Sequence, residues 1–103
     1  MDKTDALNIV LNYAETVRKS FDFKKIILFG SFAKGNQRKD SDIDVAVVFA
    51  DYDNQMERQV ELMKLTRKID TRIEPHPFRE KEFERSNPFV NEILNYGMEI
   101  VSF

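Results

Sequence analysis

The sequence predicts a mixed α/β (α+β) domain in which helices flank one sheet of about four strands. Two observations carry this prediction. Apolar residues recur every three or four positions in some segments, and short runs rich in β-branched residues fill others. The order along the chain is helix, strand, strand, helix, strand, helix, strand. Because the 103 residues contain no linker or internal repeat, we expect a single domain over residues 1–103.

The first half of the chain supplies the first helix and two strands. Residues 5–21 have the spacing of an amphipathic helix, and the apolar run at 25–29 reads as a buried strand. Residues 31–34 can form one helical turn. A polar loop then leads to residues 43–49, whose β-branched side chains predict a second strand.

The second half returns to helical spacing at residues 54–69. A short strand is expected at 71–74, ended by the prolines that follow it, since proline cannot donate to a sheet ladder. Residues 88–96 begin with proline and precede a glycine, which is typical of a helix. Residues 98–103 complete the pattern as a last strand.

Composition excludes several classes of function. Sixteen basic and 18 acidic residues give a net charge of −2, so no basic field is available to bind nucleic acid directly. The absence of cysteine excludes disulfides and cysteine-ligated zinc. No apolar run approaches the roughly 18 residues of a membrane span, and the N-terminus lacks the layout of a signal peptide. We therefore expect a cytoplasmic protein without a membrane partner.

Two acidic residues open the second predicted strand. Side chains alternate along a strand, so Asp42 and Asp44 share one face while Ile43 points to the other. Like charges placed side by side repel each other unless water or a cation separates them. Carboxylates at this spacing suit Mg²⁺. The plainer alternative is a solvated strand start, where Asp is common.

A glycine–serine pair ends the first predicted strand. Gly30 allows close approach of another group, and Ser31 offers a hydroxyl beside the free N–H groups of a helical turn. Alone, the pair is compatible with an ordinary turn. Together with Asp42 and Asp44 after ten intervening residues, it should arise by chance in roughly one such chain in a thousand. The combination favours phosphoryl or nucleotidyl transfer, which depends on positioning and charge neutralisation.

This arrangement, Gly30-Ser31-x10-Asp42-x-Asp44, resembles the signature of the DNA polymerase β-like nucleotidyltransferase superfamily. The short chain is similar to its minimal nucleotidyltransferase (MNT) branch. The resemblance implies a polymerase β-like fold, with Gly30 and Ser31 holding the triphosphate of ATP. It also implies that Asp42 and Asp44 bind Mg²⁺, with two ions expected at the site.

The resemblance further implies a third carboxylate on a nearby strand, acting as metal ligand and base. Glu74 and Asp70 are the candidates. Glu74 is favoured because it lies inside the predicted strand, whereas Asp70 lies where the helix meets it. The family more often has Asp at this position. His76 could bind a nucleotide or a metal, but it is interpreted as a loop residue that anchors the strand end, since a single histidine without partner ligands is not a site. Lys34 and Arg38 are candidate phosphate contacts.

The function that follows from the resemblance is Mg²⁺-dependent transfer of a nucleoside monophosphate, AMP from ATP, to a hydroxyl of a partner protein. Many MNT proteins are encoded beside a helical HEPN protein, which implies the antitoxin of a HEPN/MNT toxin–antitoxin pair. Alternatives are a non-catalytic module that binds nucleotide or masks its partner, and transfer to a small molecule such as an aminoglycoside.

In larger members of the family that the chain resembles, a second domain holds the acceptor. This short chain is not expected to contain one, so a homo- or hetero-oligomer is expected to supply that surface. The first predicted helix carries a second apolar line at Ala6, Ile9 and Tyr13, which we interpret as a surface left open for that partner.

Overall fold

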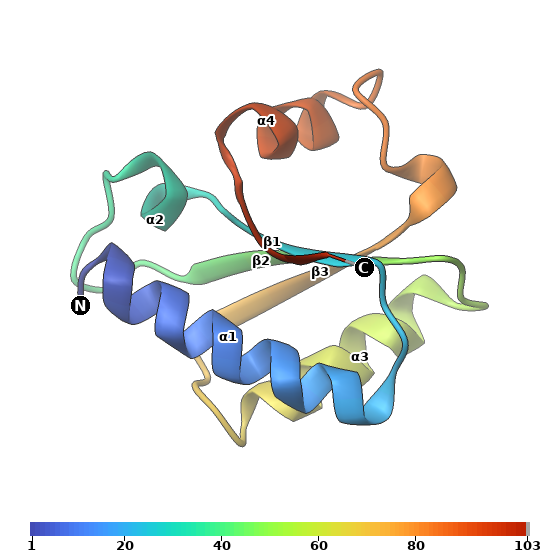
Figure 1. The fold of residues 1–103 in the computed structure, drawn as a ribbon, viewed down its shortest axis with the longest axis horizontal. Helices are drawn as coiled ribbons and strands as arrows, with labels where there is room; N and C mark the ends of the chain where they lie inside the picture. The colour runs from blue at the N-terminus through green and yellow to red at the C-terminus, as the bar shows by residue number, and fades with distance from the viewer. Residues whose placement is uncertain (103) are drawn as a thin grey trace.

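One four-stranded sheet organises the protein. The computed structural model describes residues 1–102, and Figure 1 shows the helices on both sides of the sheet. The elements, in chain order, are α1 (Lys3–Ser20), β1 (Lys25–Phe29), α2 (Ser31–Lys34), β2 (Ile43–Phe49), α3 (Gln55–Thr66), β3 (Ile73–Arg79), the short 3₁₀ turn η1 (Glu80–Glu82), α4 (Pro88–Tyr96) and β4 (Met98–Ser102). The predicted fold class is confirmed, and most elements differ from the prediction only at their ends.

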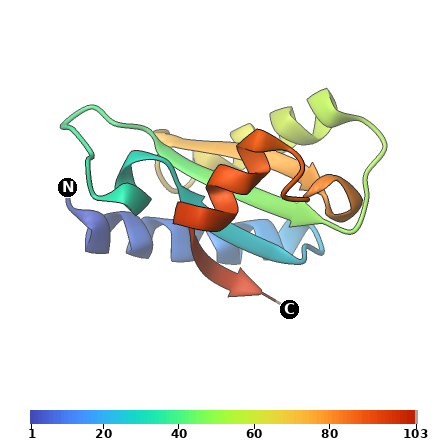
Figure 2. The same ribbon diagram turned by 90° about the horizontal axis from the view of Figure 1, so that it is seen from above.

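The strand order in the sheet is β3-β2-β1-β4. β1 pairs antiparallel with both β2 and β4, whereas β2 and β3 are parallel. Helices α1 and α3 cover one face, and α2 and α4 lie on the other (Figures 1 and 2). The parallel β2–β3 pair requires a crossover, which α3 provides.

The alternation of β2 divides its side chains between the two faces. Ile43, Val45 and Val47 are buried in the main core, together with the apolar side of α1. Ala46 belongs to a smaller cluster with residues of β1 and α4. Asp44 shares the face of Ala46, so the acidic side chain is directed away from the main core.

The apolar sector of α1 is packed inside the protein across its full width. Ala6 and Tyr13 have no exposed surface, and Ile9 is half-buried against the core. The Tyr13 hydroxyl donates a 2.8 Å hydrogen bond to the carbonyl oxygen of Leu62 in α3. The prediction that this second line stays open for a partner is therefore wrong, because the sheet and α3 cover it.

The third strand is longer than the sequence predicts, since β3 runs through Pro75 and Pro77. It lies at the edge of the sheet. The two proline carbonyls point outward and accept hydrogen bonds from Gln59 at 2.6 Å and Gln55 at 3.0 Å. At these positions an N–H would also face away from β2, so proline costs no ladder hydrogen bond.

The predicted last strand is observed as β4, and residue 103 lies outside the described residues. Among residues 1–102, no helix is both long and apolar enough to cross a membrane.

Candidate active site

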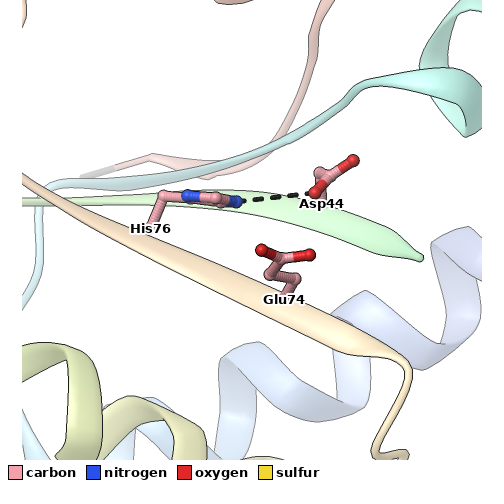
Figure 3. A group of neighbouring side chains, drawn as sticks. All are labelled: Asp44, Glu74 and His76. Carbon is pink, nitrogen blue, oxygen red and sulfur yellow. Dashed lines mark hydrogen bonds and ion pairs between the residues drawn. The ribbon is translucent and has the colours of Figure 1, made fainter.

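Three titratable side chains meet where β2 and β3 run side by side. The parallel register places Asp44 opposite Glu74 and Ala46 opposite His76. One ligand atom from each of Asp44, Glu74 and His76 lies within 4.8 Å of the others. Figure 3 shows the Asp44 carboxylate from β2 facing the His76 ring, with the Glu74 carboxylate from β3 below both. We call these three residues the acidic cluster.

The imidazole of His76 is held in place by its surroundings. Its Nε2 lies 3.4 Å from Oδ1 of Asp44 (Figure 3). Its ring lies 5.3 Å from the ring of Phe29 and 5.9 Å from that of Phe89, measured between centroids. The prediction that His76 is a loop residue is wrong, because it lies inside β3. Its two-residue spacing from Glu74 would have revealed the shared face, had the strand been extended through the prolines.

Asp42 adjoins the acidic cluster from the position before β2. Its side chain is exposed and adjoins the Glu74 carboxyl group. Burial raises the pKa of Glu74, and the adjoining carboxyl groups of Asp42 and Asp44 raise it further. The site therefore concentrates negative charge that a cation would neutralise.

The two carboxylates of the acidic cluster fit a hard divalent cation. Asp44 and Glu74 offer carboxylate oxygens, which Mg²⁺ prefers. Both side chains are only partly buried, so water and phosphate oxygens have room to complete a coordination shell. Of the carboxylates predicted to bind metal, the structure thus brings Asp44 and Glu74 together, and Asp42 is near enough to raise the pKa of Glu74.

Asp70, the alternative third carboxylate, is held by a neighbouring residue. Its oxygens accept hydrogen bonds from Nε of Arg72 at 3.0 Å and from Nη2 at 2.6 Å. The hydrogen bonds from Arg72 lower the pKa of Asp70. Asp70 also lies before β3, outside the acidic cluster. Of the two candidates, Glu74 alone belongs to the acidic cluster.

The turn between β1 and α2 brings the predicted phosphate-binding pair close to Asp44. Gly30 has a φ of 77° and precedes α2, which begins at Ser31. A Cβ atom on Gly30 would lie 2.4 Å from Oδ2 of Asp44. Both the positive φ and this contact require glycine. The backbone at Gly30 therefore borders the acidic cluster directly.

The two predicted cationic contacts lie farther out. Lys34 forms an ion pair with Glu92 of α4, and this hydrogen bond raises the pKa of Lys34. Its Nζ also lies 5.1 Å from the centroid of the Tyr96 ring. Arg38 is exposed in the loop, where its backbone N–H donates to the Ser41 hydroxyl at 2.7 Å. Contact of either cation with phosphate stays a prediction.

Substituting Gly30 by alanine tests the close approach of the turn to Asp44. We expect Gly30→Ala to displace the Asp44 carboxylate and weaken Mg²⁺-dependent binding of ATP, measured by calorimetric titration. Gly35→Ala is the matched control, because Gly35 has a similar φ of 79° but nothing within 4 Å of its Cβ position. Gly35→Ala should lose about 1 kcal/mol of stability to backbone strain. Gly30→Ala should lose more, because its ψ of −151° at positive φ lies in a region open essentially to glycine alone. Equal effects of the two variants on ATP binding would contradict the assignment.

Comparison with known proteins places this chain among the nucleotidyltransferases. The chain belongs to the family described as "Polymerase beta, Nucleotidyltransferase", which matches residues 12–102. The protein is therefore an enzyme of the nucleotidyltransferase class, and the resemblance identified in the sequence is confirmed.

Three similar proteins define the relationship more closely. "Putative protein adenylyltransferase MJ0141" of Methanocaldococcus jannaschii is 33% identical over 79 residues, covering 74% of this chain and 77% of its own. A toxin–antitoxin crystallised with AMP-PNP gives a TM-score of 0.71 at 24% identity, over 94% of this chain and 73% of the other. A complex of the tri-AMPylated Shewanella oneidensis HEPN toxin with its MNT antitoxin gives 0.65 at 20% identity, over 98% and 73%. The two structures share the fold with this chain.

Proposed function

We propose that this protein is a Mg²⁺-dependent adenylyltransferase that transfers AMP from ATP to a hydroxyl of a HEPN-type partner protein, as the antitoxin of a toxin–antitoxin pair. In this role it acts in the cytoplasm as one domain over residues 1–103. The main observation in support is the acidic cluster, whose ligand atoms lie within 4.8 Å of one another and which the Gly30 turn borders. The names of its similar proteins, a protein adenylyltransferase and an MNT antitoxin with an AMPylated HEPN toxin, support the same reading.

Each residue of the site has a distinct role in this proposal. Asp42, Asp44 and Glu74 would hold magnesium, with two ions expected, and the metal when bound neutralises phosphate charge. Ser31 and the start of α2 would contact the triphosphate. The acceptor oxygen forms a bond to the α-phosphorus of ATP while the bond to pyrophosphate breaks.

The acceptor's proton passes to Glu74 in this proposal. The raised pKa of Glu74 brings it nearer to the range in which a carboxylate is an effective general base.

Co-expression with the HEPN-type protein encoded by a neighbouring gene, followed by intact-mass analysis, tests the function. We expect the partner to gain one or more AMP units, and the gain to disappear in a variant carrying Asp42→Asn and Asp44→Asn. A stable complex without a mass change would instead indicate masking. A partner that neither associates nor gains mass would overturn the antitoxin proposal and leave a small-molecule acceptor such as an aminoglycoside to be assayed.

A further inference from the structure

A small cavity lies beside the acidic cluster, between α2 and α4. Both helices stand on the same face of the sheet (Figures 1 and 2). The cavity has a volume of about 130 Å³, and Phe29 and Gly30 are among the residues that line it. Gly30 also borders Asp44, and the ring of Phe29 contacts that of His76. Phe29 and Gly30 therefore border both the cavity and the acidic cluster.

Two aromatic side chains of α4 line this cavity while remaining open to solvent. Phe89 is 44% exposed and Tyr96 is 59% exposed. The Phe89 ring lies 5.6 Å from Phe29 and 5.9 Å from His76, so its inner edge closes the side toward the acidic cluster. Packing within the protein thus leaves a large part of each ring accessible to a ligand.

The polar part of the lining links the two helices. Lys34 of α2 and Glu92 of α4 form an ion pair at the cavity, and Lys34 lies over the Tyr96 ring. This pair offers both hydrogen-bond donors and acceptor oxygens beside the exposed aromatic rings. A flat heteroaromatic group with polar edges matches such a lining.

The size of the cavity limits which part of a ligand can occupy it. Pockets for whole ligands typically span about 300–1,000 Å³, well above the 130 Å³ found here. The cavity is therefore suited to one ring system rather than to a complete nucleotide. A nucleotide whose phosphates occupy the Gly30–Ser31 turn would have its remaining parts next to this cavity, because Gly30 lines both.

We propose that the base of the nucleotide occupies the cavity between α2 and α4, against the rings of Phe89 and Tyr96 and beside the Lys34–Glu92 ion pair. This proposal rests on the proposed function and adds the part of the site that recognises the nucleoside. The aromatic rings hold the base by stacking, which is tolerant of base identity. The ion pair bridges α2 and α4 beside this cavity.

Inorganic tripolyphosphate separates the contribution of the base from that of the phosphates. Tyr96→Ala should weaken the affinity for ATP, measured calorimetrically with Mg²⁺, by roughly tenfold, the loss typical of one stacking contact. The affinity for Mg²⁺-tripolyphosphate should stay unchanged. Tyr96→Phe should keep the ATP affinity, because it keeps the ring. Leu11→Ala, which alters an exposed apolar side chain of α1 on the opposite face, is the matched control and should leave both affinities unchanged.

The possible results distinguish this inference from the proposed function. Equal losses for ATP and tripolyphosphate in Tyr96→Ala, or no loss for either, would overturn the base site while the nucleotidyltransferase proposal stands. A wild-type protein that binds neither compound in the presence of Mg²⁺ would overturn both. A selective loss of ATP affinity in Tyr96→Ala, restored in Tyr96→Phe, would establish the base site.

Discussion

Replacing Asp42 and Asp44 together by asparagine is expected to weaken Mg²⁺-dependent binding of ATP by about 100-fold or more. Changes in residues that merely support metal ligands already cost about 10–100-fold, and here the charged groups themselves are removed. Asparagine keeps the size of each side chain, so packing beneath Asp44 against the Gly30 turn should be retained. Calorimetric titration of ATP with and without Mg²⁺ measures the effect.

The stability of the same variant separates loss of binding from loss of fold. Asp42 and Asp44 both raise the pKa of Glu74 in the folded protein, so the carboxylates oppose one another there. Removing two of the charges should leave the melting temperature without metal unchanged or higher. An unchanged Mg²⁺-dependent affinity for ATP in a folded variant would contradict the assignment of the acidic pair.

The sheet could be predicted from the sequence because its strands obey simple alternation. Ile43, Asp44 and Val45 already indicate which face is buried, and Gly30 marks the end of β1. The edge position of β3 could not be read in this way. Prolines that would break a central strand are tolerated there because their outward carbonyls bond to α3. Ending the strand too early then placed His76 in a loop.

The composition of the site depended on contacts between segments far apart in the chain. The sequence identified Asp44 and Glu74 separately, but only the parallel register of β2 and β3 puts them opposite each other. Nothing in the local pattern shows that Arg72 holds Asp70. The error about α1 has the same cause. Its wide apolar sector could face either a partner or the sheet, and only the contact of Tyr13 with α3 shows that it is covered. Direct contact of Ser31, Lys34 and Arg38 with nucleotide stays a prediction.

Glu74→Gln is expected to lower the rate of AMP transfer by about 100-fold or more, because general-base catalysis contributes roughly 10²–10⁴-fold. Binding of ATP should weaken less than in the variant carrying Asp42→Asn and Asp44→Asn, since only one of the three proposed metal ligands loses its charge. Burial and the adjoining acidic groups raise the pKa of Glu74, whereas hydrogen bonds from Arg72 lower that of Asp70. Glu74 is therefore the stronger base of the two, and it lies in the acidic cluster.

Asp70→Asn is the matched control, because like Glu74→Gln it replaces one carboxylate by its amide. Asp70 lies just before β3. The variant has a weakened ion pair with the half-exposed Arg72, and such pairs contribute only about 0–1 kcal/mol to stability. We expect its transfer rate, measured as AMP incorporated into the partner over time, to match the wild type. If Asp70→Asn abolishes transfer while Glu74→Gln does not, the base is Asp70 and the pairing of Asp44 with Glu74 serves the metal alone.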